Sequence, residues 1–174
     1  MRRVIKTFCC FYCLWFLVGC ESLKSQGKTG EMGALARMSL KDLDGRWVYL
    51  GDSLGKKVLF LSFWATWCGP CKQELKELAK MQKAWKGKPI QFLAVNTDPP
   101  ASMGRVRAFV RRVNLPLTVL MDQGSRLMKQ LNPKGNLPFY VIFDKKGTLV
   151  DSHQGYQPGD EAQIKAKLLR FLQE

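Results

Sequence analysis

Two cysteines, Cys68 and Cys71, stand three residues apart with Gly69 and Pro70 between them. An apolar run over residues 58–64 precedes the pair, and the residues after it have the apolar spacing of a helix. Two sulfurs so placed at a helix start lie on one face and can close a small disulfide ring. We expect the free N–H groups there to favour the thiolate of Cys68, while Cys71 is more shielded. Unequal thiols suit a two-step exchange, in which Cys68 attacks a partner disulfide and Cys71 resolves the mixed disulfide.

The same spacing is compatible with two other roles, half of a zinc site and a structural disulfide. A structural zinc site needs about four ligands. Downstream of Cys20 the chain offers only these two thiols and His153, so we expect no metal, and no motif calls for a cofactor. A disulfide ring of this size restrains the unfolded chain very little, which makes it a weak structural staple.

The other four cysteines lie in a segment with the form of a secretory signal: Cys9, Cys10, Cys13 and Cys20. A basic start is followed by an apolar run over residues 8–19, shorter than the roughly 18 to 20 residues of a bilayer-spanning helix. The tetrapeptide Leu-Val-Gly-Cys that ends at Cys20 resembles the lipobox of bacterial lipoproteins, which implies cleavage before Cys20 and a lipid on its sulfur. An ordinary cleaved signal and an uncleaved anchor are the alternatives. We therefore expect a signal peptide over residues 1–19, a lipidated cysteine and flexible tether over 20–37, and one domain over 38–174.

The chain is strongly basic, with 28 Lys and Arg against 14 Asp and Glu and a net charge of +14. Four arginines lie in an expected helix over residues 103–113, where Arg105 and Arg112 flank one side of the apolar stripe and Arg107 and Arg111 the other. Basic flanks suit an anionic membrane surface or an acidic partner, and equally a solvated amphipathic helix. No nucleic-acid-binding motif accompanies the charge, so nucleic acid is not an expected partner.

With 46% hydrophobic residues the chain can bury a core, and its apolar pattern predicts strands alternating with helices. Asp44-Gly45 suits a tight hairpin turn in which both central residues have positive φ. Expected strands cover residues 38–43, 46–50, 58–64, 90–95, 117–121, 139–143 and 148–152, and expected helices follow Cys71 and cover 103–113, 124–131 and 160–172. This order, a β-hairpin, βαβα, a short βα insertion and ββα, predicts an α/β fold with a central mixed β-sheet flanked by helices.

The stretch from Phe63 to Cys71, FWATWCGPC, resembles the active site of the thioredoxin superfamily, and specifically of the TlpA/ResA-like membrane-tethered thiol-disulfide oxidoreductases. The resemblance implies a thioredoxin-like fold in which Trp67, Gly69 and Pro70 frame the reactive cysteines.

The resemblance extends over roughly residues 38–172, and residues 101–131 resemble the insertion that separates this family from plain thioredoxin. It implies a cis peptide bond before Pro138, where backbone polar groups can pair with a substrate strand. Phe139 stands where the family usually has Thr, which would place an apolar ring near the substrate groove.

Two other positions depart from the family's pattern of acidic residues. Thioredoxin has a buried Asp six residues before its first active-site cysteine, and this chain has Ser62 there. The Glu that ResA-like members carry after the second core strand is matched only by Asp98, which is either a weak substitute base for Cys71 or a turn-former. Glu74 could tune the cysteine pair, but we expect it to be a solvent-facing acid at the helix start.

The resemblance implies an extracytoplasmic thiol-disulfide oxidoreductase, anchored by lipid in the bacterial cell envelope with its domain facing the periplasm. The Gly-Pro between the cysteines resembles the reducing members, although the motif does not fix the direction of electron flow. Exported proteins such as apocytochrome c are the implied substrates, and a membrane electron-transfer protein of the DsbD or cytochrome c biogenesis type is the implied reductant.

Two other functions suit the same fold. A thiol peroxidase of the peroxiredoxin type would have Pro seven residues and Thr or Ser three residues before its reactive cysteine, where this chain has Leu61 and Ala65. A redox-inert binding module is the second alternative.

Replacing Cys20 by Ala is expected to release the protein from membranes, because stable anchoring needs the hydrocarbon chains attached at that sulfur. The measurement is the partition of the full chain between membrane and soluble fractions after expression in a bacterium. Cys13→Ala is the control and should stay with the membranes. A Cys20→Ala protein that still sediments with membranes would count against the lipid anchor.

Overall fold

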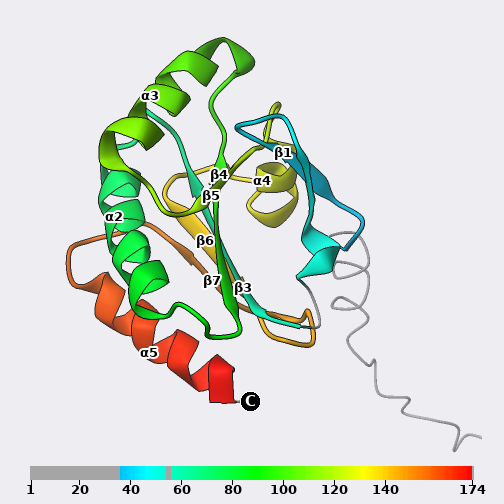
Figure 1. Cartoon of the computed structure of the whole chain (residues 1–174), viewed down its shortest axis with the longest axis vertical. Coiled ribbons are helices and arrows are strands. Elements are labelled where there is room, and N and C mark those ends of the chain that lie inside the picture. Colours follow the sequence, from blue (N-terminus) through cyan, green and yellow to red (C-terminus); the bar gives the residue numbers. More distant parts are fainter. Residues whose placement is uncertain (1–35, 54–55, 174) are drawn as a thin grey trace, which may run out of the picture.

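The computed structural model describes residues 36–53 and 56–173, which form one seven-stranded β-sheet with helices on both faces (Figure 1). Cys20, the expected signal peptide and most of the expected tether lie outside the described residues. The strands are β1 (Ser39–Asp42), β2 (Trp47–Tyr49), β3 (Val58–Trp64), β4 (Ile90–Asn96), β5 (Thr118–Met121), β6 (Phe139–Phe143) and β7 (Leu149–Gln154). The helices are α2 (Gly69–Ala84), α3 (Met103–Val113), α4 (Arg126–Leu131) and α5 (Asp160–Gln173), with short 3-10 turns η1 (Leu50–Asp52) and η2 (Pro100–Ser102).

The strands follow the order β2-β1-β5-β4-β3-β6-β7 across the sheet. β3 pairs in parallel with β4 and antiparallel with β6, so the sheet is mixed as expected. Every residue of β3 is buried, which explains why its sequence is an almost unbroken apolar run rather than an alternating one. β3 is therefore an interior strand, between β4 and β6, and the two active-site cysteines follow its carboxyl end.

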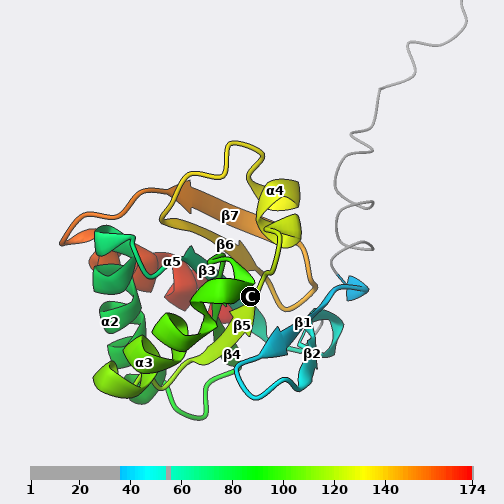
Figure 2. The ribbon, with the colours of Figure 1, turned by 90° about the horizontal axis from the view of Figure 1, so that it is seen from above.

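Helices α2, α3 and α5 cover one face of the sheet, and α4 lies against the other (Figure 2). Alternate residues of β3 point to the two faces, so Phe60 packs in the first layer and Leu61 in the second. In the first layer the ring of Phe60 stacks on that of Tyr140, with 4.8 Å between centroids. Two apolar layers thus hold β3 from both sides.

The turn of the β1–β2 hairpin differs from the expected one. Only Gly45 has a positive φ, of 83°, so the expectation that Asp44 shares that conformation is wrong. The loop contains three residues, closed by hydrogen bonds from the Gly45 N–H to the Asp42 carbonyl and from the Asp42 N–H to the Arg46 carbonyl. The Asp42 carboxylate accepts the N–H groups of Asp44 and Arg46 at 2.8 and 2.9 Å, which favours this longer loop.

The expected insertion over residues 101–131 supplies α3, β5 and α4. β5 pairs in parallel with β4 and antiparallel with β1, so it joins the N-terminal hairpin to the core of the sheet. Within the described part of the chain, no helix is long and apolar enough to cross a membrane.

Candidate active site

Cys68 and Cys71 form a disulfide at the N-terminus of α2. Cys68 is the N-cap residue, and its Sγ accepts the N–H of Cys71 at 3.3 Å. Pro70 lies in the first turn, where a helix needs no N–H donor. Cys68 is 5% exposed and Cys71 is fully buried, while Trp67, Gly69 and Pro70 are exposed around them. An incoming partner can therefore reach Cys68 and not Cys71, which is the order that a two-step exchange requires.

The buried carboxylate of Asp98 holds the loop that carries Cys68. Its Oδ2 accepts the backbone N–H of Thr66 at 2.7 Å, and its Oδ1 accepts the Thr66 hydroxyl at 3.0 Å. Oδ2 also accepts the side-chain amide of Asn96 at 2.9 Å, and the Asp98 N–H donates to Asn96 in return. Hydrogen bonds to an ionised carboxylate are stronger than neutral ones, so this network fixes the loop firmly.

These contacts make Asp98 a positioning residue for the active-site loop. Both of its carboxylate oxygens are occupied, and no hydrogen bond joins it to Cys71 among the described residues. Sequence reasoning assigned no role to Thr66 or Asn96. The Asn-x-Asp spacing after a buried strand is the signal that could have indicated the network, since short polar side chains there bond to nearby backbone.

The peptide bond between Leu137 and Pro138 is cis, as the resemblance implied. Phe139 pairs with Phe63 in the β3–β6 ladder, so Pro138 lies level with Trp64 at the edge of the sheet from which the active-site loop leaves. The expected apolar ring beside the substrate groove is wrong, because Phe139 is 6% exposed and packs on Phe63 in the core, with ring centroids 5.7 Å apart.

Glu74 is buried, which corrects the expectation that it faces solvent. It is 1% exposed, and its Oε1 accepts the hydroxyl of the buried Ser62 at 2.7 Å. Glu74 follows Cys71 by three residues and precedes Leu78 by four, so all three lie on the inward face of α2. Its other oxygen has no hydrogen-bond partner among the described residues. Ser62 stands at the position where thioredoxin has its own buried acid, and its small side chain leaves room for the carboxyl group of Glu74.

Burial raises the pKa of Glu74 to about 7, while the hydrogen bond from Ser62 lowers it and the charge of Asp160 raises it further. The carboxyl group can therefore hold or release a proton near neutral pH. It lies one helical turn from Cys71, a thiol that must lose a proton before it can attack a mixed disulfide. A titratable group with a shifted pKa beside a reactive residue is typical of active sites.

The two sulfurs are bonded to each other in this structure. No cluster of three or more His, Cys, Asp or Glu side chains that could hold a metal ion occurs in the described ranges.

The Redoxin family model matches residues 29–168. The chain belongs to the Redoxin family. It is 40% identical over 134 residues to the thioredoxin-like protein YneN of Bacillus subtilis, covering 75% of each chain. It is 32% identical over 120 residues to the thiol-disulfide oxidoreductase ResA of Bacillus cereus, covering 69% of this chain and 67% of ResA.

A solved structure shows the same fold. A Chlorobium tepidum protein assigned to the DsbE thiol:disulfide interchange proteins superposes with a TM-score of 0.70 at 32% identity, over 78% of this chain and 92% of that one. The expected thioredoxin-like fold is thus confirmed. This redoxin is a TlpA/ResA-like member of the thioredoxin superfamily and a thiol-disulfide oxidoreductase.

Replacing Glu74 by Gln is expected to remove a pH dependence of stability. Below about pH 4.5 the carboxyl is protonated in both the folded and the unfolded chain, and above about pH 7 it is ionised in both. Between these values only the folded chain keeps the proton, so the free energy of unfolding falls as pH rises, by up to about 1.4 kcal/mol per pH unit.

Urea denaturation of the oxidised protein at several pH values between 4.5 and 7.5 measures this fall. The difference between wild type and Glu74→Gln isolates the contribution of one carboxyl group. Glu77→Gln, on the same helix and paired with Lys80 at the surface, is the control and should keep the wild-type slope. Parallel curves for wild type and Glu74→Gln would contradict the assignment.

Proposed function

We propose that this chain is a lipid-anchored thiol-disulfide oxidoreductase of the bacterial cell envelope that reduces disulfides in exported proteins. The observation that carries the proposal is the Cys68–Cys71 disulfide at the N-terminus of α2, with only Cys68 reachable from outside. The signal-like segment over residues 1–19 and the lipobox-like end at Cys20 support the location. Gly-Pro between the cysteines supports the reducing direction.

In the reducing direction the cycle starts from the dithiol. The Cys68 thiolate attacks one sulfur of the substrate disulfide, forming a mixed disulfide and releasing the other sulfur as a thiolate, which takes up a proton. Cys71 then loses its proton and attacks the Sγ of Cys68, so the substrate leaves as a dithiol and the enzyme is left with the observed disulfide. Two electrons have passed from the enzyme to the substrate.

Three features near the disulfide each assist one step of this cycle. The N–H of Cys71 already donates to the Cys68 sulfur, and the same donor stabilises a thiolate there. Glu74, with its pKa of about 7, accepts the proton that Cys71 must lose. The cis bond at Pro138 lies at the same edge of the sheet, and the backbone of the half-buried Leu137 beside it is the proposed place for an extended substrate segment to pair.

The enzyme disulfide must be reduced again before the next cycle. Outside the cytoplasm this requires a membrane electron-transfer protein, and one of the DsbD or cytochrome c biogenesis type is the proposed partner. Apocytochrome c is a proposed substrate among the exported proteins.

Replacing either cysteine is expected to stop the cycle at a different step. Cys68→Ser should reduce insulin disulfides no faster than dithiothreitol alone, because the attacking sulfur is gone. Cys71→Ser should accumulate a covalent adduct with a disulfide substrate, visible by non-reducing electrophoresis, because nothing resolves the mixed disulfide. Full insulin-reducing activity in Cys68→Ser would show that the activity does not depend on this pair.

The reduction potential of the Cys68/Cys71 pair is expected near that of reducing thioredoxins, roughly −270 mV, rather than that of the oxidant DsbA, roughly −120 mV. Equilibration of the full chain with glutathione buffers, followed by alkylation and mass measurement, gives the value. A potential close to that of DsbA would reverse the proposed direction of electron flow and leave the exchange chemistry intact.

A further inference from the structure

A groove between the active-site loop and α3 lies next to the disulfide. It has a volume of about 440 Å³ and is lined by Thr66, Trp67, Lys72, Arg105, Ala108, Phe109 and Arg112. Trp67 directly precedes Cys68 and Lys72 directly follows Cys71, so the groove begins at the reactive pair. We call it the cationic groove.

Three of the seven lining residues are positively charged and none is acidic. In the described part of the chain, none of Lys72, Arg105 and Arg112 forms an ion pair with a carboxylate. Arg105 donates a hydrogen bond to the neutral hydroxyl of Ser102. Like charges gathered round one groove create a positive potential there, which a bound anion would relieve.

The ring of Phe109 lies near two of these cations. The Lys72 ammonium lies 6.0 Å and the Arg112 guanidinium 5.8 Å from the centroid of the Phe109 ring. Phe109 is itself packed on the buried Trp64, with 5.1 Å between ring centroids. Lys72 and Arg112 therefore place their charges beside an aromatic ring that is packed into the core.

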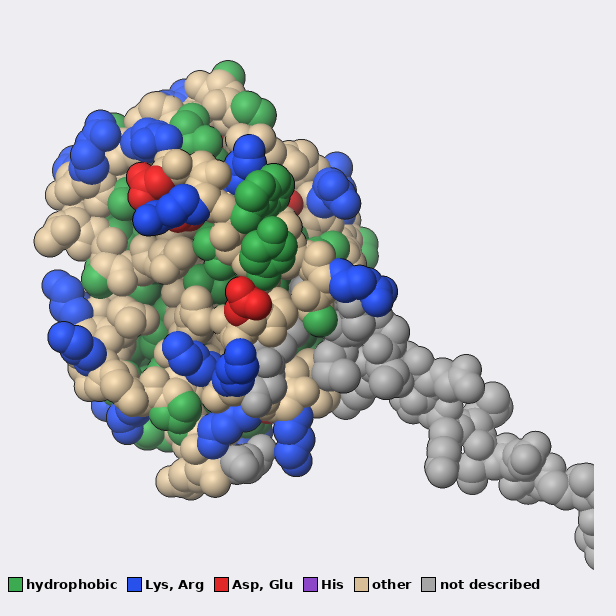
Figure 3. Space-filling model, turned by 45° about the vertical axis from the view of Figure 1, so that its right-hand side comes forward, with side chains coloured by type: hydrophobic (Ala, Val, Ile, Leu, Met, Phe, Trp, Pro, Cys, Tyr) green, Lys and Arg blue, Asp and Glu red, His purple; other side chains and the backbone are tan. Residues whose placement is uncertain are grey.

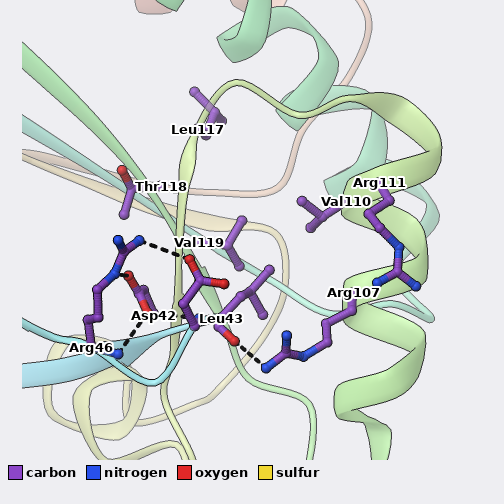
Figure 4. A pocket seen from close by; sticks show the side chains of 10 residues that line it. Asp42, Leu43, Arg46, Arg107, Val110, Arg111, Leu117, Thr118 and Val119 are labelled. Carbon is purple, nitrogen blue, oxygen red and sulfur yellow. Dashed lines mark hydrogen bonds and ion pairs between the residues drawn. The ribbon is translucent and has the colours of Figure 1, made fainter.

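A second groove on the other side of α3 shows that arginines alone do not make an anion site. It is lined by Arg46, Arg107 and Arg111, but also by Asp42 and Asp44 (Figure 4). Arg46 pairs with both of these carboxylates at 2.9 Å, and Arg107 donates to the carbonyl of Leu43. This groove supplies its own negative charge, whereas the cationic groove does not.

The two grooves divide the four arginines of α3 as their spacing predicts, with Arg105 and Arg112 on the side of the disulfide. Elsewhere, on the face drawn in Figure 3, Lys and Arg side chains are scattered among other groups rather than gathered into one patch. The distinguishing property of the cationic groove is thus its place beside the disulfide together with its lack of any carboxylate.

We propose that the cationic groove receives an acidic side chain of the substrate polypeptide, so that the enzyme prefers disulfides flanked by Asp or Glu. This inference rests on the proposed exchange with protein disulfides and names the substrate class that the site selects. Trp67, 73% exposed, offers an apolar surface on which the intervening substrate residues can lie. An extended chain advances about 3.3 Å per residue, so an acid within about three residues of the target cysteine reaches the groove.

The test compares three synthetic disulfide peptides that differ only at one position near the cysteine, which is Glu, Gln or Lys. The reduced full chain is mixed with each peptide, and the second-order rate constant of disulfide exchange is measured. The Glu peptide should react faster than the Gln peptide, by about 1.4-fold to fivefold for each ion pair formed. The preference should shrink as salt is added, because the groove is open to solvent.

Substitutions then locate the preference. Arg105→Gln and Arg112→Gln should each reduce the ratio of the Glu rate to the Gln rate toward one, and a measurable Gln rate shows that the variant is folded and active. Arg111→Gln, on the same helix but facing the other groove, is the matched control and should keep the ratio. The double variant Arg105→Glu with Arg112→Glu should prefer the Lys peptide.

The outcomes separate the two proposals. Equal rates for the Glu and Gln peptides with the wild-type protein would overturn the role of the groove and leave disulfide exchange standing. A preference that Arg111→Gln removes as fully as Arg112→Gln would overturn it too, since overall charge would then set the rate. Failure of all three peptides to react would overturn the proposed function itself.

Discussion

The active-site geometry depends on the hydrogen bonds that the buried carboxylate of Asp98 accepts. Asp98 follows β4, and its hydrogen bonds to Thr66 tie the end of that strand to the loop that leaves β3. Because β3 and β4 are parallel, their ends lie at one edge of the sheet, and a single side chain can join them. The start of α2, and with it the sulfur of Cys68, is thereby fixed relative to the sheet. None of these hydrogen bonds involves either sulfur, so opening the disulfide does not by itself remove any of them.

Glu74 and Ser62 show how the same core accommodates chemistry. The inward face of α2 is otherwise apolar, and a buried carboxyl there is destabilising unless it is hydrogen-bonded or protonated. Ser62 satisfies one oxygen and leaves the other without a partner among the described residues. The arrangement gives up some packing stability and places a carboxyl with a pKa of about 7 within one helical turn of Cys71. Such exceptions to core patterning are found where a fold serves a reaction.

The strands, the main helices and the reactive pair could all be predicted because they depend on patterns within a few residues of one another. The uniformly apolar stretch of β3 and the Cys-Gly-Pro-Cys spacing are of this kind. The burial of Glu74 could not be predicted, since it depends on a contact with Ser62, which lies twelve residues earlier on the strand that α2 covers. Similarly, helical spacing assigns Arg105 and Arg111 to opposite sides of α3. Only the tertiary structure shows that one side faces carboxylates and the other faces the disulfide.

The pairing of β1 has a consequence for the reach of the enzyme. β1 runs antiparallel to β5, with Lys41 beside Met121, so its first residue lies at the edge where β3 and β4 end. The chain therefore enters the domain at the edge that carries the disulfide. If the segment upstream of β1 is fastened to a surface, the point of attachment and the reactive sulfur lie at the same edge of the sheet. The length of that segment then sets how far from the surface the enzyme can meet a substrate. Lengthening the segment would widen this zone without altering the chemistry.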